Sequence, residues 1–254
     1  EFADYWAMTW GDLLRVKAEF PINLWPNAAQ AYHRWVRASL AENKPYDKFV
    51  REIITASGEA GKNAPVAWYR EVKDQSAQVE DTAQLFLGLR IQCARCHHHP
   101  FERRSQQDYY GFSAFFAQVG RKKGVVQGDE RIYHRRGVAA AQNPKTGQGV
   151  KPTGLGAAPL EIPADNDPRE ELANWMGQKD NPFFSRSLVN RYWKHFFGRG
   201  LVDPEDDMRV TNPASNPDLL AALAKDFSEH NFDLKNLCRT ICNSSVYQLS
   251  AEPN

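Results

Sequence analysis

Apolar side chains recur every three or four residues through most of this chain, and that spacing is typical of amphipathic helices. With 254 residues, 42% of them hydrophobic, the chain can bury one large core or two modest ones. We therefore expect a mainly α fold made of helical bundle-like units. In the first half, the pattern predicts helices over residues 5–17, 28–40, 46–56, 75–89 and 106–119.

The second half marks its helix starts with an Asp or Asn followed by Pro. An Asp or Asn side chain caps the first free N–H groups of a helix, and Pro is favoured at the first helical position. Asp233 should cap a last helix that runs to about Tyr247. The three pairs are Asp167-Pro168, Asn181-Pro182 and Asn216-Pro217.

The stretch between the two helical parts differs in composition. Gly, Pro, Lys and Gln dominate it, and its apolar runs are short. Around residues 121–160 we expect a small irregular or β-hairpin insertion, with Asn143-Pro144-Lys145-Thr146-Gly147 as its turn. The predicted units are a helical region over 1–120, a linker or β-ribbon over 121–163, and a second helical region over 164–254.

The run Cys93-Ala94-Arg95-Cys96-His97 has the Cys-x-x-Cys-His spacing used to attach haem covalently. In that chemistry two thiols add across the vinyl groups of one haem, and the adjacent imidazole becomes the proximal iron ligand. The motif therefore predicts haem c on Cys93 and Cys96, with His97 as the proximal axial ligand. The flanking helices carry Leu and Phe stripes that could exclude water from a porphyrin, although such stripes are more often core.

Two other interpretations of the motif stay open. Thiolate and imidazole are zinc's usual ligands, so Cys93, Cys96, His97 and His99 could instead hold zinc. A redox dithiol is the other, but the motif lacks the strand-then-helix context of a thioredoxin active site. The remaining cysteines, Cys238 and Cys242, are four residues apart on one face of a predicted helix. We interpret them as core residues, and a strained helical disulfide or a metal pair is the alternative.

Composition narrows the class of protein. The chain has 32 basic and 31 acidic residues, so it offers no electrostatic reason to expect nucleic acid as a partner. No run approaches the roughly 18 apolar residues of a membrane span. The chain begins at Glu1, without Met and inside a predicted helix, which we interpret as part of a longer polypeptide.

The motif and four phrases of the second half resemble exported proteins of planctomycetes and their relatives. The resemblance is carried by Leu85 to Phe101, by Asn181 to Phe184, by Leu188 to Trp193, by His195 to Val202, and by Asn216 to Leu220. In those proteins a cytochrome-c-associated region of unknown function precedes a second planctomycete-specific domain. The resemblance implies export, to the periplasm or the cell surface, and membership of a larger assembly. Members often have Asp where this chain has His98, so this chain lacks a carboxylate at that position that could orient an imidazole.

A second axial ligand must come from outside the motif, because His98 and His99 follow His97 too closely to reach the opposite face of the ring. His195 is the first candidate, since it lies in an aromatic-rich predicted helix within a family-like phrase. Met208 is the second candidate, and it would raise the reduction potential relative to a bis-His iron. The other histidines considered are His33, His134 and His230.

These features lead to three functional hypotheses. The first is an exported c-type haem protein that transfers electrons through one covalently bound haem to a redox partner protein. The second is a structural or binding module in which the cysteine and histidine cluster holds zinc. The third is a peroxidase-like haem enzyme with an open sixth iron position. No hydrolase motif or phosphate-binding glycine loop stands out.

Overall fold

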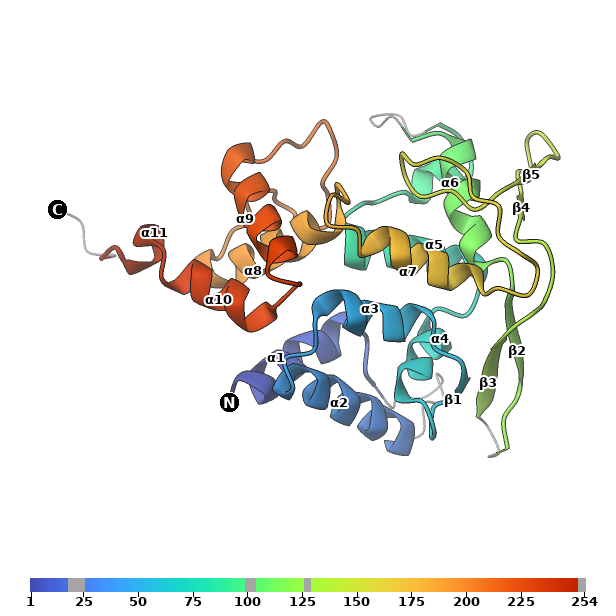
Figure 1. Ribbon diagram of the computed structural model, residues 1–254, viewed down its shortest axis with the longest axis horizontal. Coiled ribbons are helices and arrows are strands. Elements are labelled where there is room, and N and C mark those ends of the chain that lie inside the picture. The colour runs from blue at the N-terminus through green and yellow to red at the C-terminus, as the bar shows by residue number, and fades with distance from the viewer. Residues whose placement is uncertain (18–25, 99–103, 126–128, 251–254) are drawn as a thin grey trace.

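The computed structural model describes residues 1–17, 26–98, 104–125 and 129–250, and it confirms a mainly α fold (Figure 1). The α-helices are α1 (Phe2–Leu13), α2 (Pro26–Ala41), α3 (Tyr46–Ile54), α4 (Trp68–Glu71), α5 (Gln75–Leu87), α6 (Gln106–Ser113), α7 (Pro168–Met176), α8 (Phe184–Phe197), α9 (Pro217–Glu229), α10 (Leu234–Cys242) and α11 (Ser245–Gln248). Short 3₁₀ turns are η1 (Ala64–Ala67), η2 (Gln92–Arg95) and η3 (Ala114–Phe116).

Side-chain caps fix where most of the predicted helices begin. Ser105 and Asp108 form a reciprocal capping box at the start of α6. Asp167, Asn216 and Asp233 each accept a hydrogen bond from a first-turn N–H of α7, α9 and α10. Asn181 differs, because α8 begins at Phe184, two residues later than its Asn-Pro pair suggests.

Among the differences from the sequence expectation, two concern helix boundaries and one concerns an expected core position. The helix predicted over 106–119 ends at Ser113, passes through η3, and gives way to β2 (Val119–Lys123) because residues 119–123 pair with another strand. The last helix is broken, since α10 ends at Cys242 and α11 starts afresh with Ser244 as its cap. Tyr5, expected in the α1 stripe, is 48% exposed.

The expected β insertion is present as two small antiparallel sheets. In the first, β3 (Glu130–His134) lies between β1 (Gly58–Glu59) and β2. Its register pairs Ile132 with both Gly58 and Arg121. In the second, β4 (Ala141–Gln142) pairs with β5 (Gly149–Val150) around the predicted turn. The strands form a ribbon at one edge of the molecule (Figure 1).

One hydrophobic core runs through both helical regions. Aromatic rings join α1 and α3 to α8, far along the chain. Trp6 stacks on Tyr192 with centroids 4.2 Å apart, and Tyr46 stacks on Phe184 at 4.8 Å. The same apolar cluster extends from Trp6 to Ile241. Burial of this continuous surface is the main force that holds the two regions together.

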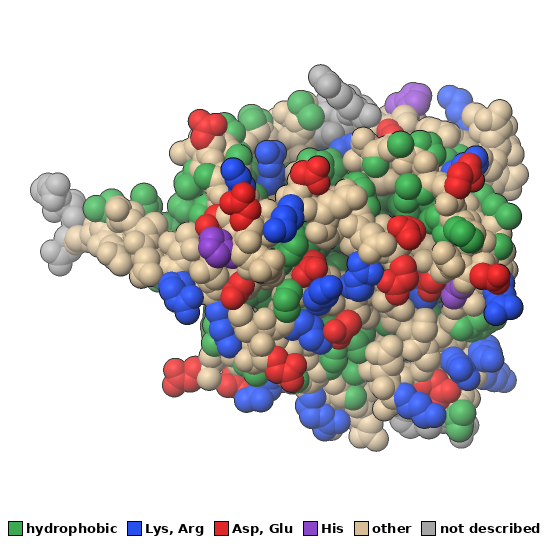
Figure 2. Space-filling view, viewed as in Figure 1, with side chains coloured by type: hydrophobic (Ala, Val, Ile, Leu, Met, Phe, Trp, Pro, Cys, Tyr) green, Lys and Arg blue, Asp and Glu red, His purple; other side chains and the backbone are tan. Residues whose placement is uncertain are grey.

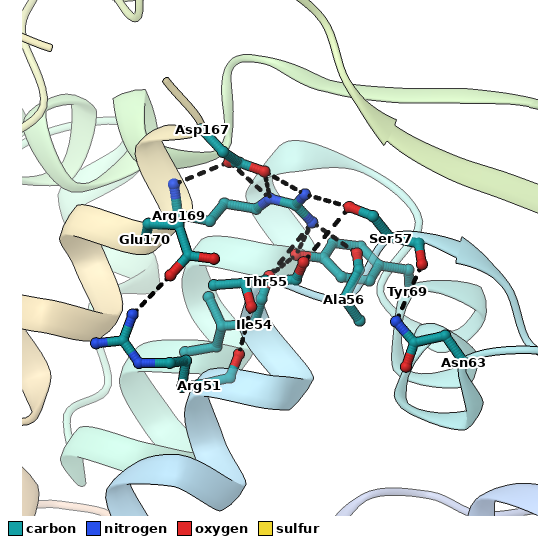
Figure 3. Close-up of polar contacts among 10 residues, drawn as sticks. All are labelled: Arg51, Ile54, Thr55, Ala56, Ser57, Asn63, Tyr69, Asp167, Arg169 and Glu170. Atoms are coloured by element: carbon teal, nitrogen blue, oxygen red, sulfur yellow. Dashed lines mark hydrogen bonds and ion pairs between the residues drawn. The ribbon is translucent and has the colours of Figure 1, made fainter. Parts of the chain in front are cut away.

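Arg169 of α7 adds a polar link inside that core, with only 1% of its surface exposed (Figure 3). Its guanidinium donates to the Ala56 carbonyl at 2.9 Å and to the Ser57 hydroxyl at 2.9 Å. It also donates to the Tyr69 hydroxyl at 2.8 Å and pairs with Asp167 at 2.6 Å. Because its charge is paired and its donors are bonded, this buried cation is tolerated.

The surface carries charges of both signs. On the face drawn in Figure 2, acidic and basic side chains are interspersed rather than gathered by sign, in keeping with the formal net charge of +1. None of the helices within the described residues is both long and apolar enough to span a bilayer.

Candidate functional site

The two motif cysteines and His97 lie in and just after η2, a short helical turn. In a 3₁₀ turn, positions three residues apart lie over one another, so Cys93 and Cys96 share one side of the turn, and His97 follows Cys96 directly. All three are exposed, and neither cysteine forms a disulfide. Ala94, between them, is fully buried. The turn therefore presents two free thiols and an imidazole outward while its inner side is fixed in the core.

Hydrogen bonds from α6 hold this turn in place. The amide of Gln106, a residue only 6% exposed, donates to the Arg95 carbonyl at 3.0 Å and to the Cys96 carbonyl at 3.2 Å. The Tyr110 hydroxyl donates to the same Arg95 carbonyl at 3.2 Å. These contacts satisfy carbonyls that so short a helical turn leaves without partners. Sequence reasoning missed both residues, although Gln106 directly follows a recognisable helix cap.

His97 has a hydrogen bond that fixes which ring nitrogen carries its proton. Its Nδ1 lies 2.7 Å from the His98 carbonyl oxygen. A carbonyl can only accept, so Nδ1 carries the hydrogen, and Nε2 of the neutral ring is left with a lone pair. Histidines that bind metals almost always donate their other ring N–H in this way. The imidazole is thus prepared to act as a ligand through Nε2.

Arg95 places a positive charge beside the thiols. A hydrogen bond with the Cys96 side chain, together with the charge of Glu80, raises the pKa of Arg95 above its usual value. Glu80 lies 3.5 Å from the guanidinium. Arg95 is exposed, so it supplies a cation to the outer face of the turn rather than a structural contact.

Gly88 and Met208 control how the chain reaches the motif. Gly88 ends α5 in the left-handed conformation, with φ of 68°. The Met208 N–H donates to the Gly88 carbonyl at 2.9 Å. A Cβ on Gly88 would lie 3.2 Å from the Met208 sulfur and 3.1 Å from the Ser187 hydroxyl. Met208, the second candidate for a distal ligand, therefore packs five residues before Cys93.

The acidic loop around Met208 is hydrogen-bonded to the segment that leads into the motif. Arg90 binds Asp206 through two hydrogen bonds of 2.6 and 3.2 Å. The Gln84 amide also donates to Asp206, at 2.5 Å, and accepts from Gln92 at 3.1 Å. Although burial acts in the opposite direction, the bonds from Arg90 and Gln84 hold the pKa of Asp206 below its usual 3.8. The sequence offered no signal for this pairing across 116 residues.

His195, the first candidate for a distal ligand, lies against α1. Its Nε2 is 3.3 Å from the Tyr5 hydroxyl, and its ring centroid is 4.7 Å from that of Trp6. Ser187 is the α8 residue beside Gly88, and His195 is eight residues further on, which is about 12 Å along a helix. The structure therefore brings His195 together with the N-terminal helix.

The other histidines are dispersed. His33 lies near Gly11, on the neighbouring helix. His134 ends β3, and its Nε2 is buried without a partner among the described residues. His230 bonds the Asp226 carbonyl within α9 at 2.8 Å. His99, the candidate for a zinc shell, lies outside the described residues.

Two tests bear on how well these residues suit a cofactor. Within residues 1–17, 26–98, 104–125 and 129–250, no group of three or more His, Cys, Asp or Glu side chains converges as a metal shell. Phe112, Phe115 and Phe116, from the stripe interpreted more readily as core than as a porphyrin wall, are core, with at most 2% exposed. The Phe stripe therefore belongs to the core and forms no surface beside the exposed thiols.

Comparison with protein families assigns both regions. PSCyt2, a protein family of unknown function (DUF1549), matches residues 1–121, and PSD1, a protein family of unknown function (DUF1553), matches residues 168–254. No curated protein and no solved structure matches the chain. The chain therefore belongs to the planctomycete-type proteins in which a cytochrome-c-associated PSCyt2 region precedes a PSD1 domain.

Proposed function

We propose that this protein carries one c-type haem on Cys93, Cys96 and His97 and transfers electrons through it. The observation that carries the proposal is the η2 turn with the two residues after it, where two free thiols and an imidazole are exposed. A haem bound there supplies an iron centre that exchanges one electron. The supporting chemistry is the pre-set tautomer of His97, whose Nε2 is available to a metal.

Each residue of the turn has a distinct task in this proposal. Cys93 and Cys96 would hold the group, because each thiol adds across a vinyl double bond, sulfur to one carbon and hydrogen to the other. His97 would bind the iron through Nε2, while the His98 carbonyl keeps the ring oriented. Gln106 and Tyr110 would keep the turn fixed. A fixed turn reduces the reorganisation that accompanies electron transfer.

The surroundings fit a site that meets a partner protein. The three donors are exposed, so the edge of the haem would remain accessible to a redox partner. The proposal leaves the sixth ligand open, since His195 contacts α1 and Met208 packs on Gly88. It also places the protein outside the cytoplasm, in the periplasm or at the cell surface.

The test is production of the protein, exported, in bacteria that have the c-type haem maturation machinery. We expect a mass increase of one haem and a pyridine haemochrome spectrum typical of two thioether bonds. Cys93→Ser with Cys96→Ser should abolish both, whereas Cys242→Ser, outside the motif, should keep both. A purified wild-type chain with an unmodified mass and one bound zinc per chain would overturn the haem proposal and favour a zinc site.

A further inference from the structure

A cavity of about 440 Å³ lies between the start of α8 and one face of α9. This volume is in the range of small-molecule sites. The first turn of α8 contributes Ser185 and Arg186, and the segment before it contributes Lys179, Asp180, Asn181 and Pro182. From α9 the wall is formed by Ala221, Ala224, Lys225, Ser228 and Glu229.

The α8 end of the cavity offers unpaired backbone donors. The Asn181 side chain accepts from the N–H groups of Phe183 and Phe184, both at 3.0 Å. The next two N–H groups, of Ser185 and Arg186, have no acceptor in the part of the chain that the structure describes. Free N–H groups and the helix dipole make such an end favourable for an anion.

The Ser185 side chain is a second, independent indication of a ligand. Ser185 is only 4% exposed and lines the cavity, yet its hydroxyl bonds to no described residue. Ser228, on the opposite wall and 2% exposed, donates to the Lys225 carbonyl at 3.0 Å. The Ser185 oxygen is open to the cavity rather than sealed in the core, so the hydroxyl can donate a hydrogen bond to a ligand oxygen there.

The charges around the cavity favour an anion of low charge. Lys179 and Arg186 have no ion-pair partner among the described residues, whereas Lys225 lies 3.8 Å from Glu229. The lining holds three cations, Lys179, Arg186 and Lys225, and two carboxylates, Asp180 and Glu229. We propose that this cavity binds a small molecule through an oxyanion group, which accepts hydrogen bonds from the start of α8 and the Ser185 hydroxyl.

The probes are inorganic sulfate, inorganic phosphate and acetate, titrated into the ¹⁵N-labelled full chain and followed by NMR. Chloride at matched ionic strength is the control. We expect saturable shifts of the Ser185 and Arg186 amides, and affinity about tenfold weaker for Ser185→Ala and for Arg186→Gln, the usual effect of losing a hydrogen bond to a charged group. Binding of sulfate and phosphate alone would indicate an ester ligand, and binding of acetate a carboxylate.

Lys145→Gln, an exposed loop residue, is the matched charge control and should leave the affinity unchanged. Far-UV circular dichroism establishes that each variant is folded. If the Ser185→Ala variant is unfolded, the anion affinity of Arg186→Gln, a substitution of an exposed residue, is the test. The proposal is overturned by shifts that rise linearly without saturation, by equal shifts with chloride, or by unchanged affinity in Arg186→Gln.

Discussion

At the scale of single residues, the motif depends on Gly88 as much as on its own cysteines. Gly88 turns the chain out of α5 with φ of 68°, and its missing Cβ leaves room for Met208 and Ser187. The left-handed conformation costs an L-residue about 1–2 kcal/mol. The direction in which the chain enters the η2 turn is therefore set by one residue with no chemistry of its own.

We expect Gly88→Ala to lower the free energy of unfolding by about 2–3 kcal/mol, from strained backbone and from crowding against Met208. Gly156→Ala is the matched control. Gly156 also has a positive φ, of 86°, but nothing lies within 4 Å of its Cβ position. Urea unfolding of both variants separates the cost of the strained backbone, which the two variants share, from the cost of crowding, which only Gly88→Ala has. A loss for Gly88→Ala no larger than that for Gly156→Ala would show that close packing there is unimportant.

The residue scale also shows the limit of sequence reasoning about the site. The motif was identifiable because its donors lie close together in the sequence, and the three-residue spacing puts Cys93 and Cys96 on one side of a short helical turn. The bond from His97 Nδ1 to the His98 carbonyl depends on a local backbone path that no spacing specifies. Contacts such as Met208 with Gly88 join distant segments and depend on the tertiary fold.

At the scale of elements, helix starts were predictable and some helix ends were not. A capping side chain acts within three residues, so Ser105, Asp167 and Asn216 could be recognised locally. Residues 114–119 continue the apolar spacing of α6, but Val119 pairs with His134 and starts a strand instead. Strand pairing depends on residues that are distant in the sequence, and here it outweighs the local preference for a helix.

The cap of α6 is expected to matter for the motif, because α6 carries Gln106 and Tyr110. Ser105→Ala removes one half of the capping box and should lower the free energy of unfolding by about 1 kcal/mol. Ser244→Ala, at the cap of the short α11, should cost less because that helix has no buried residue. Chemical denaturation measures both. Equal losses would mean that α6 does not depend on its cap.

The link between α5 and the loop before α9 should depend on pH. The folded-state pKa of Asp206 is below its usual 3.8, so the stabilisation is present above that value and is lost as the pH falls through the lowered one. Asp206→Asn should therefore lower the free energy of unfolding by about 1 kcal/mol near neutral pH. Its difference from wild type should shrink below pH 3.8. Urea unfolding across this range tests the sign, and a difference that stays constant with pH would contradict the assignment.

At the scale of the whole molecule, the two family regions fold over one core. The PSCyt2 match ends at residue 121 and the PSD1 match starts at 168, yet one apolar cluster includes side chains from both. Compositional change near residue 120 was visible in the sequence, whereas the shared core was not. Trp6 stacks on Tyr192 because α8 packs against the N-terminal helix α1, far away in the sequence.

Arg169 offers the sharpest test of that continuity, because it is the buried polar link from α7 to the segment after α3 (Figure 3). Arg169→Met would leave Asp167 and the Ala56 carbonyl without their main partner, so we expect a loss of about 3–5 kcal/mol. Nearby, Arg51 pairs with Glu170 at 2.6 Å, with side chains 30% and 50% exposed, and Arg51→Met should cost under about 1 kcal/mol. If the regions share one core, Arg169→Met will shift a single unfolding transition, seen alike by tryptophan fluorescence and far-UV circular dichroism. Two separate transitions, with only one of them shifted, would show that the regions unfold independently and that the shared core contributes little to their cohesion.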